Sequence, residues 1–412
     1  MLLSHLLDHL ITRGTLRVLT PDDTAHVFSG GDGPEVTIRL HDPKLAWKLF
    51  VNPRLALGEA YMDGTLTVEN GSIYDLLELL TLNMELAPPS VLRPLYNGYG
   101  RLFRFLQQYN PVSRARRNVA HHYDLSDQLY ALFLDSDRQY SCAYFLSPDD
   151  DIDAAQLNKK RHLAAKLKLE PGQRVLDIGC GWGWLALFLA RESGAHVVGL
   201  TLSEEQLKVA RERAAAAGLA DRVQFYLRDY REETGEYDRI VSVGMFEHVG
   251  VLHYPEYFRQ VKRLLKRDGI ALLHAIGRAD GPGSTNPWIR KYIFPGGYSP
   301  ALSEVVPVVE KTGLWITDIE VLRLHYARTL RAWRERFLAN RDRVKALYDE
   351  RFCRMWEFYL AGSEVAFRYM GHMVFQMQLA RSVDAVPLTR DYIVDWEREQ
   401  RGDGAAATER AA

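Results

Sequence analysis

Three glycines at two-residue spacing follow an apolar run and an acidic residue near the middle of the chain. The segment Arg174-Val-Leu-Asp-Ile-Gly-Cys-Gly-Trp-Gly places Asp177 before Gly179, Gly181 and Gly183. Glycine lets the backbone approach a ligand closely, and a strand-to-helix turn is a common ligand site. The spacing differs from that of dinucleotide-binding loops, and no phosphate-binding lysine follows. We therefore predict a cofactor loop, with Asp177 suited to a ligand that carries an ammonium group and a sulfonium.

Two further segments place polar side chains where neighbouring strands would end. After the apolar run from His196, the chain offers Thr201 and Gln206 but no carboxylate, so these two side chains are expected to bind the ribose hydroxyls of a nucleoside. Asp229 and Tyr230 follow the third strand and suit an adenine, with a carboxylate for the exocyclic amine and a ring for stacking. Taken alone, an Asp-Tyr pair is more typical of a turn.

A carboxylate and an imidazole belong to the next two apolar runs. Glu247 follows Ile240-Val-Ser-Val-Gly, and His274 lies inside Ile270-Ala-Leu-Leu-His-Ala-Ile. Because open α/β sheets bind ligands at the carboxyl ends of their strands, both side chains are expected in the ligand crevice. A carboxylate buried there needs a partner or a shifted pKa. A purely structural Glu–His pair is the alternative explanation.

The elements that must position these residues alternate between strand and helix from about residue 170 to 322. Such alternation predicts an α/β fold with a mostly parallel, doubly wound sheet. The expected elements are Arg174–Ile178, Gly183–Glu192, His196–Leu200, Glu204–Ala217, Arg222–Leu227, Tyr237–Val243, Glu256–Leu265 and Gly269–Ile276.

Segments of different character flank this region. Residues 1–90 combine an amphipathic N-terminal helix, a strand at Glu35–Leu40 and a helix at Ile73–Leu82, which predicts a small α+β domain that associates with lipid or dimerises. Residues 91–117 contain six arginines and are predicted to form a basic linker. A catalytic domain is expected over 118–395, nearly all helical from Tyr326 to Arg381, followed by a disordered tail over 396–412.

The composition excludes several classes of protein. The 412 residues include 52 Lys+Arg against 53 Asp+Glu, so no broad basic face is expected to bind nucleic acid. Cys142, Cys180 and Cys353 lack the paired spacing of a disulfide scaffold or a metal site, which fits a reducing cytoplasm. No apolar run approaches the ~20 residues of a membrane span, so a lipid substrate would be met from the bilayer surface.

Together these features resemble the cyclopropane-fatty-acyl-phospholipid synthase family, which includes the mycolic acid cyclopropane synthases. The match extends from about Asn118 to Asp395. The resemblance implies a Rossmann-like class I methyltransferase fold, S-adenosylmethionine as cofactor, and the conversion of a cis double bond of an unsaturated phospholipid acyl chain into a cyclopropane. The motifs are His121-His-Tyr-Asp-Leu-Ser, Gln139-Tyr-Ser-Cys-Ala-Tyr-Phe, Leu176-Asp-Ile-Gly-Cys-Gly-Trp-Gly-Trp, Thr201-Leu-Ser-Glu-Glu-Gln, Met245-Phe-Glu-His-Val-Gly, Leu273-His-Ala-Ile-Gly, His325-Tyr-Ala-Arg-Thr-Leu and Phe352-Cys-Arg-Met-Trp-Glu-Phe-Tyr-Leu.

The resemblance also implies roles for individual residues. Tyr140 and Ser141 are expected at the methionine end of the cofactor. A bound bicarbonate is expected to act as the catalytic base. Its expected ligands are the side chains of Glu247, His274 and Tyr326 and backbone groups near Cys142 and Ile276.

The implied chemistry needs a dry pocket with aromatic walls. An alkene is a weak nucleophile, so orientation and exclusion of water must supply much of the rate. Methyl transfer leaves a carbocation, which aromatic faces stabilise and a base then deprotonates. Aromatic side chains are frequent around the motifs, although core packing would explain each one alone: Tyr140, Tyr144, Phe145, Tyr326, Trp356 and Tyr359.

Ser363 departs from the family pattern, because many members have a cysteine at this position. It falls on a stripe of apolar residues that recur at helical spacing and is therefore expected to face the pocket or the core. We interpret it as a polar pocket contact rather than a nucleophile. The stripe consists of Phe352, Met355, Trp356, Tyr359, Phe367, Met370, Val374 and Met377.

Other functions share parts of this pattern. A lipid C-methyltransferase that forms a methyl-branched or methylene product would pass through the same carbocation. A non-catalytic lipid carrier would have no need for Glu247, His274 and Tyr326 together, and a small-molecule methyltransferase would leave the aromatic late helices unexplained. The arginines at 93–117 favour peripheral contact with the inner face of the membrane, although a linker packed on the catalytic domain would look similar. The N-terminal domain could also form a homodimer.

Overall fold

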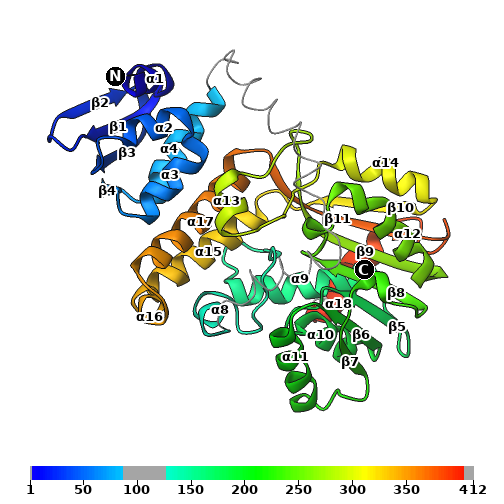
Figure 1. The fold of residues 1–412 in the computed structure, drawn as a ribbon. Coiled ribbons are helices and arrows are strands. Elements are labelled where there is room, and N and C mark those ends of the chain that lie inside the picture. The colour runs from blue at the N-terminus through cyan, green and yellow to red at the C-terminus, as the bar shows by residue number, and fades with distance from the viewer. Residues whose placement is uncertain (1, 87–126, 403–412) are drawn as a thin grey trace, which may run out of the picture.

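The computed structural model describes residues 2–86 and 127–402, which form a small N-terminal domain and a larger α/β domain (Figure 1). The predicted basic linker and the motif at His121 lie outside the described residues. Within the two described ranges, no helix combines the length and the apolar character that crossing a membrane requires.

The N-terminal domain has the expected α+β character. Its four strands are ordered β2-β1-β3-β4, and their buried side chains form one core with the helices. The elements are α1 (Leu2–Leu10), β1 (Arg13–Leu19), β2 (Ala25–Ser29), β3 (Gly31–Leu40), α2 (Leu45–Val51), α3 (Pro53–Met62), β4 (Leu66–Asn70) and α4 (Ile73–Leu86).

The larger domain contains a seven-stranded sheet in the order β10-β11-β9-β8-β5-β6-β7. The pairs β8–β9, β5–β8, β5–β6 and β6–β7 are parallel, whereas β11 runs antiparallel to both of its neighbours. This confirms the predicted α/β fold with a mostly parallel, doubly wound sheet. The strands are β5 (Arg174–Ile178), β6 (His196–Thr201), β7 (Val223–Leu227), β8 (Tyr237–Val243), β9 (Leu265–Arg278), β10 (Trp315–Val321) and β11 (His372–Ala380).

Helices cover both faces of this sheet. One face packs against α12 (Tyr254–Leu264) and α14 (Leu302–Thr312). The other packs against α9 (Ile152–Leu167), α10 (Trp184–Ser193) and α11 (Glu204–Ala216). The carboxyl ends of the parallel strands are therefore the open edge at which a ligand can reach the fold.

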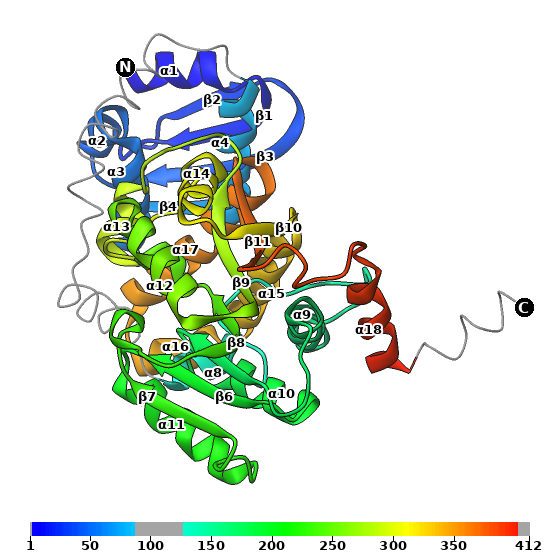
Figure 2. The same ribbon diagram turned by 90° about the vertical axis from the view of Figure 1, so that its right-hand side faces the viewer.

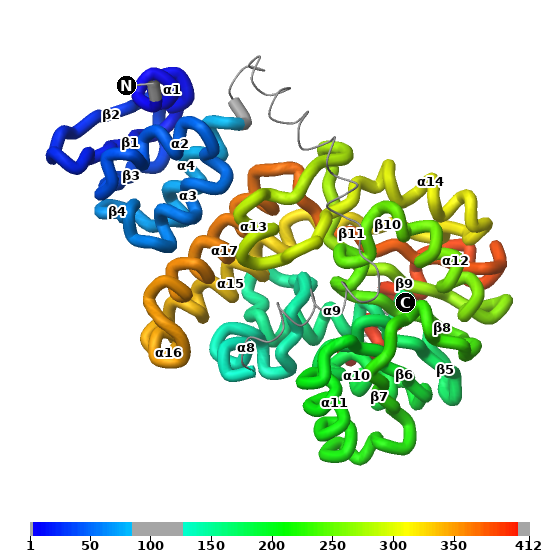
Figure 3. Tube along the Cα trace, viewed as in Figure 1, coloured from blue at the N-terminus to red at the C-terminus, as the bar shows by residue number. Residues whose placement is uncertain are grey.

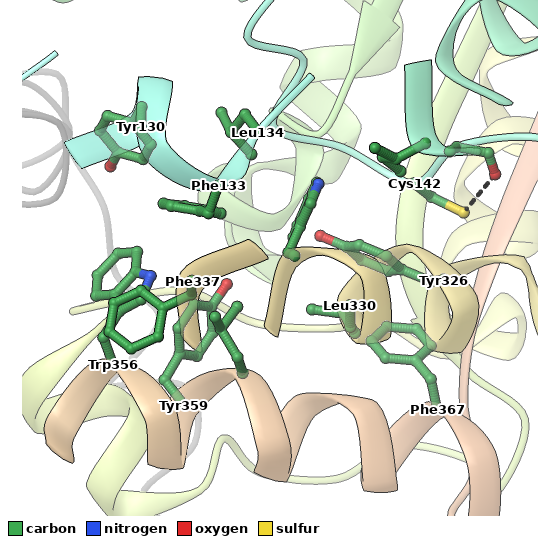
Figure 4. Packing of buried hydrophobic residues seen from close by; sticks show 14 of the residues in the cluster. Tyr130, Phe133, Leu134, Cys142, Tyr326, Leu330, Phe337, Trp356, Tyr359 and Phe367 are labelled. Carbon is green, nitrogen blue, oxygen red and sulfur yellow. Dashed lines mark hydrogen bonds between the residues drawn. The ribbon is translucent and has the colours of Figure 1, made fainter. Parts of the chain in front are cut away.

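A third group of helices stands beside the sheet. It contains α8 (Asp127–Phe133), α15 (His325–Ala339), α16 (Arg341–Leu347) and α17 (Glu350–Tyr369). Their apolar faces meet around a set of buried or half-buried rings that we call the aromatic cluster (Figure 4). Its members are Tyr130, Phe133, Tyr140, Tyr326, Trp333, Trp356, Tyr359 and Phe367.

The prediction of continuous helix from Tyr326 to Arg381 is wrong in its last part. Helix α17 ends at Tyr369, and residues 372–380 form strand β11 inside the sheet. Eight of the nine residues of β11 are buried, and Val374 and Met377 also fit the helical spacing of α17, which obscured the alternation from Phe375 to Leu379. Periodicity alone cannot distinguish such a strand from a buried helix. Val374 and Met377 therefore do not belong to the helical stripe.

The disordered tail was predicted to begin too early. Residues 391–401 form helix α18 (Asp391–Arg401), which lies beside α9 (Figure 2). Its charged sequence hides the buried contacts of Ile393 and Glu397. Residues 403–412 lie outside the described residues.

The N-terminal domain rests on the outer side of α17 and on α13 (Pro287–Tyr292), as Figure 3 shows. Lys291 bonds Glu59 at 2.6 Å, and Arg351 bonds Asp63 at 2.8 Å. The side chain of Trp288 packs directly over Gly58. The two domains thus share a contact made of both ion pairs and close packing.

Candidate active site

The glycine loop begins where β5 ends and turns back into α10. Gly179, Gly181 and Gly183 have φ angles of 82°, 56° and 83°, a region that glycine adopts without the penalty that a Cβ brings. The amides of Gly179 and Cys180 both donate to the Leu200 carbonyl at 2.9 Å. The loop is therefore fastened to β6 and holds a fixed shape.

The glycines serve different purposes. A Cβ on Gly183 would lie 2.7 Å from the Phe225 ring, so this glycine permits close packing of α10 on the sheet. A Cβ on Gly181 would meet only the Trp184 indole, at 3.9 Å, and one on Gly244 would have nothing within 4 Å. Gly181 and Gly244 are the positions at which backbone faces open space, as a bound ligand requires.

A pocket lies at the carboxyl ends of the parallel strands, where α/β folds of this kind bind their ligands. Several of the predicted cofactor residues line it: Gly179, Gly181, Thr201, Gln206, Asp229 and Tyr230. Tyr140, Ser141, Asp177 and Gly183 are not part of this lining.

Thr201 and Gln206 form a pair at the end of β6. The Thr201 hydroxyl donates to Gln206 Oε1 at 2.9 Å, and Ser203 caps α11 by accepting from the Gln206 amide. This arrangement leaves the Gln206 side-chain NH₂ group as a donor at the pocket wall. Both residues stand where the sequence places the contacts to a nucleoside ribose.

Asp229 already has a strong partner. Both of its carboxylate oxygens accept from the Arg231 guanidinium, at 2.8 and 2.7 Å. The sequence analysis did not identify Arg231, which also lines the pocket. A carboxylate has lone pairs for about four hydrogen bonds, so Asp229 can accept from an adenine amine while Arg231 holds it. Tyr230 is buried and packs edge-on against Tyr257, with ring centroids 5.3 Å apart.

Asp177 lies directly behind the loop on β5. It is 2% exposed, and its Oδ2 has no hydrogen-bond partner among the described residues. Burial raises the pKa of Asp177 to about 7. A buried carboxyl without a partner is costly, so an ammonium-bearing ligand is the kind of group that would satisfy it.

Tyr140 and Ser141 lie together between the aromatic cluster and α9. The Tyr140 hydroxyl lies 2.6 Å from that of Tyr359, and its ring stacks on Trp333 with centroids 5.2 Å apart. Ser141 Oγ accepts from the Lys159 ammonium at 2.7 Å. Tyr140 therefore belongs to the aromatic wall, whereas Ser141 belongs to a polar contact that the sequence did not predict.

Glu247 stands at the junction between the pocket and the aromatic cluster. Its neighbours Met245 and His248 line the pocket, while its Oε1 accepts from the amide of Ile276, at 2.6 Å. Ile276 packs against the aromatic cluster. The Glu247 Oε2 atom is buried without a partner among the described residues, and burial raises the pKa of Glu247 to about 7.

His274 lies two residues before Ile276 on β9, on the same face of the sheet. Its Nδ1 lies 3.2 Å from Nε2 of Gln376, the residue opposite it on β11. Burial, reinforced by the nearby charges of Lys159 and Lys166, lowers the pKa of His274, so its imidazole is neutral at pH 7.

The remaining predicted residues belong to the aromatic cluster or border it. Tyr326 is 7% exposed and packs on Phe367, with centroids 4.6 Å apart. Cys142 is buried, and burial raises the pKa of its thiol, which disfavours the reactive thiolate form. Ser363 is half-buried on α17, one turn after Tyr359 and one turn before Phe367. The structure thus brings Cys142, Ile276 and Tyr326 together in one apolar cluster, joined to Glu247 through the Ile276 backbone.

Sequence reasoning missed three polar residues of this region: Lys159, Arg231 and His248. Arg231 directly follows the predicted Asp-Tyr pair, and His248 directly follows Glu247, so their positions beside strand ends were available signals. Lys159 offered no such signal, because residues 159–166 of its helix include three lysines and an arginine. Only the fold shows that Lys159 is the buried one beside Ser141.

Comparison with known proteins agrees with this geometry. Residues 111–377 match the family model described as mycolic acid cyclopropane synthetase, and residues 2–86 match a domain of unknown function. A tuberculostearic acid methyltransferase of Mycobacterium tuberculosis is 39% identical over 92% of this chain and 90% of its own. A cyclopropane-fatty-acyl-phospholipid synthase of Escherichia coli is 38% identical over 87% of this chain and 91% of its own.

The fold is also that of a solved relative. The structure of mycolic acid cyclopropane synthase CmaA1 complexed with SAH and CTAB superposes with a TM-score of 0.61 at 34% identity, covering 66% of this chain and 99% of that one. The SAH in that complex agrees in kind with a cofactor pocket at the glycine loop. The chain therefore belongs to the mycolic acid cyclopropane synthetase family of S-adenosylmethionine-dependent methyltransferases.

Proposed function

We propose that this enzyme converts a cis double bond in an unsaturated phospholipid acyl chain into a cyclopropane. The observation that carries the proposal is Glu247, a buried carboxyl with one orphaned oxygen, positioned between the cofactor pocket and the aromatic cluster. S-adenosylmethionine, when bound, supplies the electrophilic methyl group. The side chains around it hold the acyl chain and exclude water. They also position the group that removes one proton from the transferred methyl carbon.

The aromatic cluster suits the carbocation that methyl transfer creates. Rings of Tyr140, Tyr326 and Tyr359 gather on one side of the Ile276 strand, and the cluster is otherwise made of apolar side chains. Faces of such rings attract cations, and the absence of water protects the cation from attack. These side chains orient the acyl chain and shield the reacting carbons.

Glu247 suits the role of holding a bicarbonate that removes the proton. With a pKa of about 7, its carboxyl group is protonated often enough at neutral pH to donate a hydrogen bond to an oxyanion. The proton leaves the transferred methyl carbon for the bicarbonate, and the C–H electron pair closes the ring. The Ile276 amide, which was expected to bind bicarbonate, instead donates its hydrogen bond to Glu247 in this structure.

A second product deserves direct comparison, because one of the relatives with the highest identity is named as a tuberculostearic acid methyltransferase. In that alternative the same cation loses a chain proton and leaves a methyl-branched alkene, or it undergoes a hydride shift and then loses a methyl proton, which leaves a methylene chain. In either case we propose that the enzyme meets its lipid at the membrane surface, with the arginine-rich segment over residues 93–117 as the expected contact with anionic head groups.

The deciding experiment uses S-adenosylmethionine with a trideuterated methyl group and vesicles of unsaturated phospholipid. A cyclopropane retains two deuterium atoms and gives high-field ring protons by NMR. A methylene product also retains two but gives vinylic signals, and a methyl branch formed by loss of a chain proton retains all three. Absence of any deuterium from the recovered acyl chains would contradict the proposal for both products.

A further inference from the structure

Lys159 is a lysine buried behind the glycine loop, where burial lowers the pKa of its amine to about 7 and the nearby charge of Asp135 opposes this shift. Its side chain is fully buried, and no carboxylate of the described residues lies within 4 Å of its ammonium. The ammonium lies 4.2 Å from the centroid of the Trp184 ring and donates to Ser141 Oγ at 2.7 Å. A buried ammonium with one hydrogen bond to a neutral group is unusual, because its desolvation is only partly offset.

The contact with Lys159 determines what Ser141 can do. In its protonated form Lys159 only donates hydrogen bonds, and Ser141 Oγ is then the acceptor in this pair. The serine proton then has to point away from Lys159, and no acceptor among the described residues takes it. Ser141 is therefore held as a donor that lacks an acceptor.

The Ser141–Lys159 pair is connected to the glycine loop through Trp184. Trp184, which packs on Lys159, is also the side chain nearest to the open face of Gly181. Ser141 thus stands close behind the loop on which the ligand rests, where the family resemblance places the methionine end. The methionine moiety ends in a carboxylate, an acceptor that binds hydroxyl donors well.

We propose that Lys159 is a positioning residue that fixes the Ser141 hydroxyl as a donor to the carboxylate of S-adenosylmethionine. The inference rests on the assignment of this cofactor but not on the identity of the lipid product. Lys159 acts through Ser141 and through the positive potential it adds near the carboxylate. Its removal should therefore affect only ligands that carry the amino-acid part of the cofactor.

The test compares two ligands by calorimetry: S-adenosylhomocysteine, which carries the carboxylate, and methylthioadenosine, which lacks the amino-acid part. Lys159→Met should weaken S-adenosylhomocysteine binding by about 10-fold or more, as expected for loss of a hydrogen bond to a charged group, and leave methylthioadenosine binding within twofold. Ser141→Ala, which removes only the hydroxyl, should show the same selectivity. The double variant should lose no more than Lys159→Met alone, because both act through one contact.

Lys166 provides a matched control, since it is an equally buried lysine of α9 that pairs with Glu320 and Asp318 instead. Lys166→Met should lower stability but keep the ratio of the two affinities. Equal weakening of both ligands in Lys159→Met, or a Ser141→Ala variant without selective loss, would overturn the proposal even if one variant folds poorly. A wild-type protein that does not bind S-adenosylhomocysteine would overturn the proposal and the cofactor assignment together.

Discussion

Two buried carboxyl groups, Asp177 and Glu247, set the electrostatic character of the site. Each has one oxygen without a partner among the described residues, and burial raises the pKa of each to about 7. Groups of this kind reduce the stability of the fold and persist where a ligand needs them. The two residues face different ligands, since one lies behind the cofactor loop and the other beside the aromatic cluster.

Asp177→Asn should change how stability depends on pH. The folded pKa exceeds the ordinary value, so between about pH 4 and 7 the folded state holds the proton more tightly than the unfolded state, and stability falls as pH rises through this interval. Asparagine cannot ionise, so the variant should exceed wild type in stability at pH 8, by up to roughly 4 kcal/mol, but not at pH 4. Urea denaturation at both pH values measures this difference. An identical pH slope in the two proteins would show that Asp177 is not buried as a titrating acid.

Glu247→Gln should reduce turnover by orders of magnitude and leave affinity for S-adenosylmethionine nearly unchanged, because the side chain would act on the proton transfer rather than on the cofactor. Glu335→Gln is the control, since Glu335 is an exposed residue of α15. Decarbonated buffer should slow the wild type, and added bicarbonate should restore it. Activity that does not respond to bicarbonate would contradict the proposed base.

At the residue scale, the sequence identified the pocket residues on strand ends but not their partners. Glu247 and Asp229 were predictable because they follow apolar runs, whereas the Ile276 amide that holds Glu247 and the Arg231 guanidinium that holds Asp229 come from the folded arrangement. Hydrogen-bond partners of this kind depend on distances of a few tenths of an ångström. Spacing in the sequence does not carry that information.

At the element scale, helix α18 stabilises the segment that carries Tyr140 and Ser141. Glu397 of α18 bonds His162 Nδ1 at 2.6 Å, and Glu320 bonds the other nitrogen at 2.7 Å. The His162 ring stacks on Tyr144 with centroids 4.1 Å apart. A helix predicted to be a tail is therefore linked, through two side chains, to a segment of the site.

Glu397→Ala should lower the melting temperature by several degrees, because it leaves a buried histidine nitrogen without its partner. It should also reduce activity, since Tyr144 loses a fixed neighbour. Glu399→Ala on the exposed side of the same helix is the control and should match wild type in both respects. Equal effects of the two substitutions would show that the contact with His162 contributes nothing specific.

The strands of the larger sheet show what the sequence could and could not predict about elements. Strand β5 and strand β8 were predicted with their observed bounds because turn residues and glycines limit them. Strand β11 was mistaken for helix, because Val374 and Met377 continue the helical spacing of the preceding segment into the strand. Helix α18 was missed because a single buried glutamate does not stand out among charged residues.

At the scale of the whole molecule, α17 is shared between the two domains. One side carries Trp356 and Tyr359 into the aromatic cluster. The other side contacts the N-terminal domain, where the ring centroids of Phe358 and Tyr61 lie 6.2 Å apart. The position of the N-terminal domain is therefore linked to the aromatic cluster by one shared helix. The sequence indicated both domains but not this shared helix, because the apolar pattern of a helix does not identify the domain against which each of its faces packs.

Gly58→Ala should disturb this contact. The new Cβ would lie 2.5 Å from the Trp288 indole and 2.9 Å from the Phe358 ring, and neither ring can move without displacing its neighbours. We expect lower stability, by about 1–3 kcal/mol, and reduced activity on vesicles. Gly362→Ala is the matched control on the same interface, because its Cβ would meet only Leu77 at an ordinary 3.8 Å and would favour the helix. Unfolding curves and vesicle assays distinguish the two variants, and an unperturbed Gly58→Ala would mean that the domains are not in close contact.

The late helices occupy a particular place in the chain: they all lie between β10 and β11, two strands that pair directly. The Leu322 amide, just after β10, donates to the Val374 carbonyl of β11 at 2.8 Å, so the chain leaves the sheet and returns to it at one point. Helices α15, α16 and α17 form an insertion between these two strands, and the two ends of the insertion lie side by side in the sheet. The helices of this segment can therefore vary without a change in the strands that carry the glycine loop. Exchanging residues 323–373 between relatives that form different products should then transfer acyl-chain preference in one step, while binding of the cofactor stays unchanged.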